Sequence, residues 1–261
     1  MIDLTMNTAT VRRTITDFIR EQLSQAGTPR GVINLSGGID SALACTLAAE
    51  ALGPKNVLAL RLPYRDSSPD SLAHAQLVID GLGVQSITYR ITPMVAPLFK
   101  HFPEMSQVRR GNVLARARMI VLYDQSVAFG GLPIGTSNKT EMLLGYTTIY
   151  GDAACAINPL GDLYKTQVRQ LARDVGVPAP ILHKPPSADL WDGQTDEDEL
   201  GFTYAEVDQM LALLVEQRAT LADCEAAGFE GAFVRHVIGR VQRMHYKRVL
   251  PPVAVISKPA R

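Results

Sequence analysis

The sequence predicts an α/β protein built on a doubly wound parallel sheet flanked by helices. Short apolar runs rich in β-branched residues alternate with longer stretches of helical periodicity, as in parallel strands joined by crossover helices. A glycine-rich turn separates the first such run from the helix that follows it. At 261 residues, 46% of them apolar, one large α/β domain or at most two small ones can bury a continuous core. Because no Gly/Ser-rich or Pro-rich linker divides the chain, we expect a single domain over residues 1–261.

The first half of the chain supplies most of the expected sheet. Apolar residues at helical spacing predict a helix over 8–26, which Gly27 and Pro29 end. A β-branched run predicts a strand over 31–35, and a glycine turn then leads to a helix over 42–52, closed by Gly53 and Pro54. The alternation continues with a strand at 57–62, a helix at 68–82 and a strand at 85–91.

The second half begins with the longest expected helix, 111–129, and a short buried strand at 132–135. Ligands of such sheets bind beyond the carboxyl ends of the strands. The remainder is richer in loops, with helices expected over 166–175, 204–216 and 233–243. An acidic run at 192–199 and a basic stretch at 240–248 are strong local charge biases, and we expect each to be a solvated face rather than a binding site.

The overall charge excludes several classes of protein. Lys and Arg number 26 and so do Asp and Glu, which disfavours a protein that coats nucleic acid or an anionic membrane. No apolar stretch is long enough for a membrane span, and the three cysteines are too far apart for a disulfide framework or a zinc site. We therefore expect a cytoplasmic protein in a reducing compartment.

The motif Ser36-Gly-Gly-Ile-Asp-Ser41 lies between a predicted strand and a predicted helix. Its glycines let the backbone approach a polyanion, while amides at the helix start and the hydroxyls of Ser36 and Ser41 hold phosphate groups. Asp40 inside an anion site implies a divalent cation, for which Mg²⁺ is the natural choice. The alternative is a tight turn whose Ser or Asp caps a helix.

With this motif the chain resembles the N-type ATP pyrophosphatases, and within them the ammonia-dependent NAD synthetases. The resemblance covers nearly the whole chain and implies the Rossmann-like fold of the pyrophosphatase group. Besides the glycine motif, it is carried by Leu62-Pro-Tyr-Arg65, Ile91-Thr-Pro93, Gly111-Asn-Val-Leu-Ala-Arg-Ala-Arg118, Gly135-Thr-Ser-Asn-Lys-Thr-Glu141, Tyr150-Gly-Asp152, Gly161-Asp-Leu-Tyr-Lys165, Pro186-Ser-Ala-Asp-Leu190 and Lys247-Arg248.

The resemblance implies a set of residues for ATP and its metal. Asp40 and Glu141 match the two Mg²⁺ carboxylates, and Lys165 matches the lysine that stabilises charge on the phosphates. Without the resemblance, Glu141 would be a first-turn helix acid, Lys165 an exposed lysine at a helix start and Ser187 a helix N-cap. The residues expected to bind ATP are Asn34, Leu35, Ser36, Gly37, Gly38, Ile39, Asp40, Ser41, Thr136, Lys165 and Ser187.

The resemblance also implies a site for the acceptor substrate. Arg116 and Lys247 match contacts to deamido-NAD, whereas Arg118 points elsewhere on its helix and is expected to be structural. Asp152 matches the aspartate that orients ammonia; its alternative is a turn residue after a glycine. Three positions assigned to this site depart from many relatives, with Ile149, Ala156 and Tyr246 where lysine, aspartate and histidine are common.

These residues together predict a ligase that forms AMP and pyrophosphate. It would adenylate the nicotinate carboxylate of deamido-NAD and aminolyse it with ammonia to give NAD. The departures leave open another carboxylate as acceptor; a tRNA-modifying pyrophosphatase is a further alternative, which the charge balance disfavours. A regulatory nucleotide-binding protein is disfavoured because Asp40, Glu141, Asp152 and Lys165 occur together.

The resemblance implies a homodimer as well, for which the helices at 8–26 and 111–129 are the candidate contacts. Ammonia would arrive free or from a separate glutaminase, and no nucleic acid or membrane partner is expected. The loops 65–69 and 185–200 are expected to be lids over the ATP site.

Overall fold

A computed structural model describes residues 2–187 and 195–255 of the chain. Four strands form one parallel sheet in the order β3-β2-β1-β4: β1 (Gly31–Asn34), β2 (Val57–Arg61), β3 (Gln85–Thr88) and β4 (Leu132–Ile134). Because the chain moves outward from β1 to β3 and then returns to the other side of β1, the order reverses between β1 and β4. Such a switch point is where open α/β sheets bind ligands, at the carboxyl ends of the strands.

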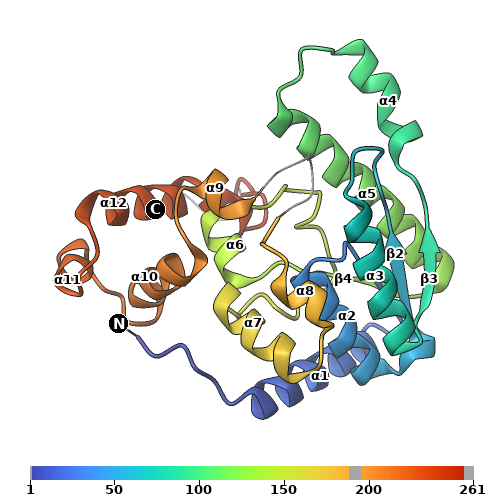
Figure 1. The fold of residues 1–261 in the computed structure, drawn as a ribbon, viewed down its shortest axis with the longest axis horizontal. Coiled ribbons are helices and arrows are strands. Elements are labelled where there is room, and N and C mark those ends of the chain that lie inside the picture. Colours follow the sequence, from blue (N-terminus) through green and yellow to red (C-terminus); the bar gives the residue numbers. More distant parts are fainter. Residues whose placement is uncertain (1, 188–194, 256–261) are drawn as a thin grey trace.

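Helices cover both faces of the sheet, which confirms the predicted fold class (Figure 1). The helices up to β4 are α1 (Thr8–Gln25), α2 (Ile39–Leu52), α3 (Pro69–Leu82), α4 (Thr92–His101) and α5 (Gln107–Phe129). Those after it are α6 (Lys139–Leu144), α7 (Lys165–Asp174), α8 (Ala179–His183), α9 (Asp196–Leu200), α10 (Tyr204–Glu216), α11 (Leu221–Ala226) and α12 (Gly231–Arg243), with short 3₁₀ turns at Pro54–Asn56 and His245–Lys247.

Alternate residues of the strands supply two separate cores. Ile33, Ala59 and Ile134 pack under α1, α2 and α7 on one face, whereas Val32 and Leu60 pack under α4 and α5 on the other. This alternation follows from the period of two along a strand, and both sets are apolar because both faces are covered. The two clusters pack on opposite faces of the sheet and so hold the strands whose carboxyl ends carry the loops.

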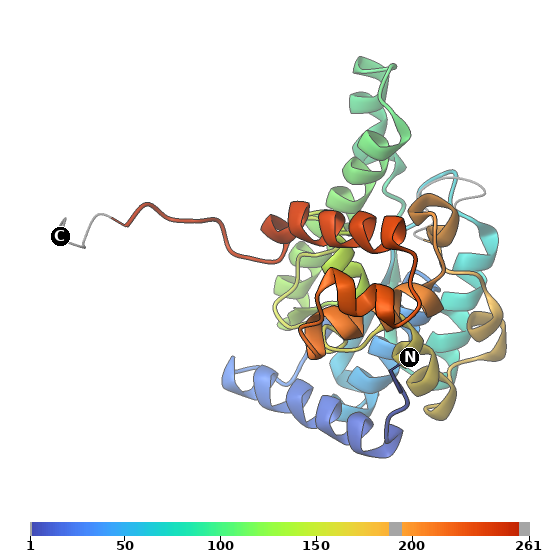
Figure 2. The same cartoon turned by 90° about the vertical axis from the view of Figure 1, so that its left-hand side faces the viewer.

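A third hydrophobic cluster joins the last helices to the sheet domain. Its buried members include Val207, Met210 and Leu211 of α10 and Val234 and Val237 of α12. Leu144 of α6 and Tyr164, directly before α7, belong to the same cluster. Helices α10 and α12 therefore lie against α6, and α10 also against α7, while α11 packs on α10 and α12 (Figure 1). Figure 2 shows the last described residues running away from the body.

The predicted elements are present, with differences at their ends. The strand expected at 85–91 stops at Thr88, although Tyr89 N still donates to Arg61 O at the end of β2 and Ile91 N to Pro63 O just beyond it. The helix expected at 111–129 starts four residues earlier, because the Ser106 side chain caps it. The sequence pattern did not predict α4, which contains Pro97, or the short helices α6, α8, α9 and α11.

The prediction that residues 240–248 form a solvated face is wrong at Arg240, Lys247 and Arg248, although Arg243 is exposed as expected. Arg240 donates to Leu144 O, and Arg248 donates to Leu143 O at 2.6 Å. Lys247 Nζ donates to the carbonyls of Gly145 and Thr147 at 2.8 and 2.7 Å. These cations satisfy the carbonyls at and beyond the end of α6, which have no partner within the helix and favour positive charge.

Among the residues that the structure describes, no helix is both long and apolar enough to cross a membrane. The cysteines Cys45, Cys155 and Cys224 are all free thiols, in agreement with the expectation that they form no disulfide framework.

Candidate active site

The glycine motif occupies the turn between β1 and α2, at the switch point of the sheet. Gly37 has φ +82°, and a Cβ atom there would stand 2.2 Å from Ser71 O, so both the backbone conformation and the space require glycine. Ser36 Oγ and Ser41 Oγ lie 3.0 Å apart, and Gly38 N donates to Ser36 Oγ. The turn therefore presents two hydroxyls and the start of α2 to the carboxyl edge of the sheet, which suits an anionic ligand.

The other residues predicted for ATP lie around the same edge. Asn34 ends β1, and its side-chain Oδ1 is buried without a hydrogen-bond partner in the described part of the chain. Thr136 is half-buried two residues beyond β4, the strand paired with β1. Ser187 is also half-buried. The residues that follow it, 188–194, lie outside the described residues, and they include part of the predicted lid at 185–200 and part of the acidic run at 192–199.

Three charged side chains from separate elements meet at this edge. Lys165, the first residue of α7, places its Nζ 2.6 Å from Asp40 Oδ2 and 3.0 Å from Glu141 Oε1. The lysine side chain is 3% exposed and the carboxylates only 16% and 15%, so the ions interact with little screening by water. The predicted metal carboxylates and the predicted phosphate lysine thus form one cluster.

The charges in this cluster shift one another's protonation equilibria. Burial raises the pKa of Glu141 to about 7, with Asp40 acting in the same direction and Lys165 against it. Burial alone would lower the pKa of Lys165, but the carboxylates of Asp40 and Glu141 raise it well above its usual value. Lys165 therefore carries a permanent positive charge at the site.

Asn138 holds Asp40 and Glu141 in place, a role that the sequence analysis did not assign. It is fully buried, and its Nδ2 donates to Asp40 Oδ1 at 2.9 Å. Its Oδ1 accepts from Glu141 N at 3.0 Å as the N-cap of α6, while Glu141 Oε2 accepts from Asn138 N in a capping box. The spacing Asn-x-x-Glu is a capping signal that is visible in the sequence.

A second missed group, Asp196 and Tyr204, lies on the far side of Lys165. The ring of Tyr204 packs against the ammonium, with its centroid 5.2 Å from Lys165 Nζ, and its hydroxyl donates to Asp196 Oδ2 at 3.0 Å. Asp196 is 4% exposed, and burial raises its pKa, opposed by Lys165. The expectation of a solvated acidic run is therefore wrong at Asp196, which helix α9 turns inward.

The residues predicted for the acceptor substrate gather around the loop between α6 and residue 156. Asp152 Oδ1 accepts from Thr148 N at 2.7 Å, and loss of surrounding water raises the pKa of Asp152, although its side chain still reaches the surface. Arg116 of α5 donates twice to Ile149 O, at 3.3 and 3.2 Å. Lys247 is close enough for its charge to affect the pKa of Asp152. Arg118 instead donates to Leu62 O, as a structural residue would.

The three positions that depart from the resemblance carry no ionisable cation or carboxylate here. Ile149 is half-buried and offers only its carbonyl to Arg116. Ala156 is exposed and pairs its backbone N–H with Pro133 O. Tyr246 is 57% exposed on the 3₁₀ turn after α12. The charged side chains on the acceptor side are therefore Arg116, Asp152 and Lys247.

The side chains at the ATP edge fit a hard divalent cation. Carboxylate oxygens from Asp40 and Glu141 are the donors that Mg²⁺ prefers, and phosphate oxygens and water would complete its coordination. Within residues 2–187 and 195–255, no group of three or more His, Cys, Asp or Glu side chains suited to a metal occurs.

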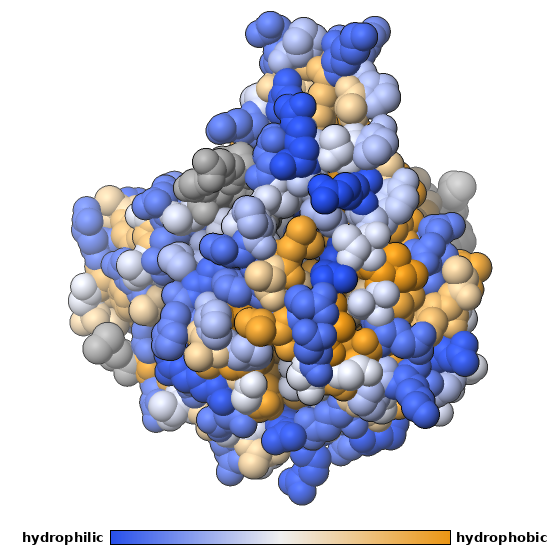
Figure 3. Space-filling view, turned by 45° about the vertical axis from the view of Figure 1, so that its right-hand side comes forward, coloured by the Kyte–Doolittle hydropathy of each residue, from blue (hydrophilic) through white to orange (hydrophobic). Residues whose placement is uncertain are grey.

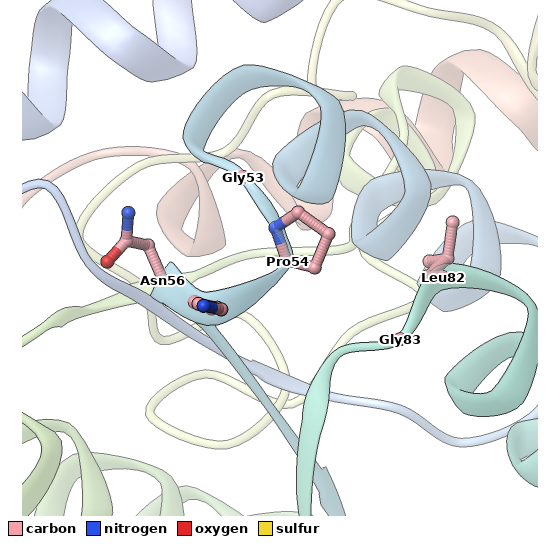
Figure 4. A pocket seen from close by; sticks show the side chains of 6 residues that line it. Gly53, Pro54, Asn56, Leu82 and Gly83 are labelled. Carbon is pink, nitrogen blue, oxygen red and sulfur yellow. The ribbon is translucent and has the colours of Figure 1, made fainter.

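A groove at the opposite end of the sheet has no part in this site. It lies where β2 and β3 begin and is lined by Gly53, Pro54, Lys55, Asn56, Leu82 and Gly83 (Figure 4). None of the predicted site residues belongs to it, and parallel sheets bind ligands at the other edge.

Comparison with known proteins identifies what this arrangement is similar to. A family model described as NAD synthase matches residues 11–251. The NH3-dependent NAD+ synthetase of Trichlorobacter lovleyi is 56% identical over 98% of this chain and 94% of its own length. Among solved structures, an NH3-dependent NAD synthetase from Campylobacter jejuni has a TM-score of 0.82 at 32% identity, covering 96% of this chain and 100% of that one. An NMN synthetase from Francisella tularensis has a TM-score of 0.83 at 33% identity, covering 96% and 99%.

Proposed function

The chain belongs to the NAD synthase family, and from this premise we propose how its residues carry out an ammonia-dependent ligase reaction. The enzyme forms NAD by amidation: the nicotinate carboxylate of deamido-NAD attacks the α-phosphorus of ATP and releases pyrophosphate. Ammonia then attacks the carbonyl carbon of the acyl-adenylate, and AMP leaves. The observation that carries the assignment of roles is the cluster of Lys165, Asp40 and Glu141 beside the glycine turn.

In the first step the chain's own residues stabilise negative charge on the phosphates. The turn at Gly37 and Gly38, with the start of α2, would hold the pyrophosphate that departs. Lys165 would supply a fixed positive charge in a site with little water, where preorganised charges lower a barrier most. Asp40 and Glu141 would hold Mg²⁺, which as a Lewis acid neutralises charge on the phosphate oxygens.

In the second step Asp152 would orient ammonia and take up a proton. Its raised pKa brings the carboxylate closer to the working pH, which favours proton transfer. Arg116 and Lys247 supply positive charge on the same side of the site and would face the anionic groups of the acceptor substrate. Ammonia would arrive free or from a separate glutaminase.

A homodimer is part of this proposal, because the outer side of α5 is apolar and uncovered. Ile120 and Val127 on that helix are 55% and 82% exposed. Since α5 also carries Arg116, a partner packed on this helix would lie next to the acceptor site.

The identity of the acceptor is tested with purified enzyme, ATP, Mg²⁺ and ammonium. NAD formation from deamido-NAD with equal release of AMP and pyrophosphate is the expected result. If no NAD forms from deamido-NAD, and AMP is released when another carboxylic acid is supplied, the assignment of the acceptor is contradicted.

A second candidate acceptor is nicotinate mononucleotide. The similarity to an NMN synthetase supports it, and Ile149 and Ala156 lack the charged contacts that the resemblance implies for deamido-NAD. The two acceptors are compared by kcat/KM in one preparation; a higher value for the mononucleotide would make it the substrate. A tRNA-modifying role has no support from the family match.

A further inference from the structure

Asp208 lies in the middle of α10, fully buried, and faces the starts of two other helices. Its Oδ1 accepts from Thr140 Oγ1 at 2.5 Å, and its Oδ2 accepts from Thr166 N at 2.8 Å. No Lys, Arg or His in the described part of the chain forms an ion pair with it. A buried carboxylate without a cation is costly unless its hydrogen bonds are well made, so these two contacts are what keeps it in place.

The two contacts of Asp208 lead directly to the charged cluster. Thr140 immediately precedes Glu141 in α6, and Thr166 immediately follows Lys165 in α7. Thr140 Oγ1 also accepts from Lys165 N at 3.0 Å, so the first turns of α6 and α7 are joined to each other as well as to α10. Figure 1 shows α10 beside both helices. The Asp208 carboxylate therefore contacts the helix turns that carry both Glu141 and Lys165.

We propose that Asp208 is a positioning residue for the amidation reaction, which it serves by setting α6 and α7 so that Glu141 and Lys165 meet Asp40. The proposal rests on the function proposed above for those three residues. Asp208 touches neither substrate nor reacting atoms; it acts through Thr140 and Thr166. A displacement of about 1 Å in a catalytic group costs roughly 100-fold in rate, so this support has a measurable effect on kcat.

The first test is the near-isosteric variant Asp208→Asn. The Thr140 hydroxyl and the Thr166 N–H donate to different oxygens of Asp208, and the amide replaces one of these oxygens by an NH2 group, so one of the two contacts can no longer be made as it stands. We expect kcat for NAD formation to fall at least about tenfold. This is less than the roughly 100-fold loss for a 1 Å displacement, because one of the two contacts remains. KM for ATP is expected to stay within about threefold of the wild type, because the glycine turn is untouched.

Two further variants separate positioning from general loss of stability. Met210→Ala removes a buried side chain from the same helix, α10, and breaks no hydrogen bond to α6 or α7. This variant is expected to lower the melting temperature by about 4 °C or more and to leave kcat unchanged. Thr140→Val removes the linking hydroxyl and is expected to lower kcat like Asp208→Asn. The double variant is expected to be no slower than the slower single variant, because both changes break one linkage.

The proposal is overturned if Asp208→Asn keeps kcat within twofold of the wild type, or if Met210→Ala lowers kcat as much as Asp208→Asn does. It is also overturned if the loss of kcat in the Asp208→Asn, Thr140→Val double variant equals the product of the two single losses. Should Asp208→Asn fail to fold, Thr140→Val is judged by the same limits. A wild type that makes no NAD contradicts the proposed function. A wild type that makes NAD beside an equally fast Asp208→Asn contradicts only the positioning role.

Discussion

Lys165 is the residue at which the charges of the candidate site converge. Replacing it by methionine keeps the length of the side chain but removes the positive charge that faces two carboxylates and, in the proposed reaction, the phosphates. We expect Lys165→Met to lower kcat by about 10²- to 10³-fold, the range seen when one preorganised charge donor is lost. Pyrophosphate release is the measurement.

Lys100→Met is the matched control for Lys165, because Lys100 is exposed near the end of α4 and forms no ion pair in the described chain. An equal loss in both variants, or full activity of Lys165→Met, would contradict the role given to Lys165.

Glu141 predicts a pH dependence of stability in the metal-free protein. Its pKa is about 7 in the folded chain and is raised from an ordinary value of 4.5 by burial. The folded state therefore binds more protons than the unfolded state between these values, so the stability that this group contributes is present below pH 4.5 and is lost as the pH rises through 7. Urea unfolding with a chelator is expected to show the free energy of unfolding falling from pH 5 to pH 8 more steeply in the wild type than in Glu141→Gln.

The control for Glu141 is Glu104→Gln, which removes an exposed carboxylate. It is expected to leave the pH profile as in the wild type. Parallel profiles for the wild type and Glu141→Gln would show that this carboxylate does not titrate abnormally.

At the scale of elements, the turn between β1 and α2 depends on one glycine. Gly37 and Gly53 have nearly the same φ, +82° and +83°, but of these two only Gly37 lies against another backbone. Gly53→Ala is expected to cost about 1 to 3 kcal/mol for its conformation alone. Gly37→Ala adds a collision with Ser71 O and is expected to cost at least about 2 kcal/mol more and to abolish tight ATP binding.

Chemical unfolding of the two glycine variants, with calorimetric titration of ATP, measures both effects. An equal fall in the free energy of unfolding of the two variants would show that the close approach of residue 37 to Ser71 O does not affect stability.

Elements with strong periodicity were predictable, and those held by distant contacts were not. The strand, glycine turn and helix from Gly31 to Leu52 follow from local pattern, because burial on both faces and a tight turn leave a signature in neighbouring residues. The basic stretch at 240–248 has no such signature. Its partners are carbonyls about 100 residues earlier in the chain, and only the packing of α12 beside α6 brings them together.

The same limit applies to the candidate site. Asp40, Glu141 and Lys165 were proposed from motifs, and the structure brings them into contact. Asp208 and Asp196 were not proposed, since a buried carboxylate and an exposed one look alike in a helical pattern. Of the residues missed, Asn138 had the clearest local signal.

At the scale of the whole molecule, the helices on the two faces of the sheet differ in what they expose. α1, α2, α3 and α7 cover one face, and α4 and α5 cover the other, where the outer side of α5 exposes Ile120 and Val127. Figure 3 brings the β3 side of the molecule forward and shows hydrophobic residues gathered in the middle of that surface. Exposed apolar side chains gathered on one surface are typical of an interface with another protein molecule.

The proposed dimer predicts that a charge on the outer side of α5 separates the subunits. Val127 is 82% exposed, and Val127→Glu would bury an unpaired carboxylate in a dimer that uses this helix. Sedimentation is expected to show twice the monomer mass for the wild type and the monomer for the variant. Val215→Glu, on the exposed side of α10, is the control and is expected to leave the mass unchanged. A monomeric wild type would contradict the dimer.

The hydrogen bonds from Arg240, Lys247 and Arg248 to the end of α6 bear on the order in which a growing chain acquires its parts. A ribosome releases the amino-terminal segments first, so the sheet, the glycine turn and Lys165 can assemble while these three cations are still being added. Until then the carbonyls of Leu143, Leu144, Gly145 and Thr147 lack these partners, although Arg116 can already hold the following loop at Ile149 O. Lys247 is thus among the last groups of the candidate site to be synthesised, after Asp40, Glu141 and Lys165.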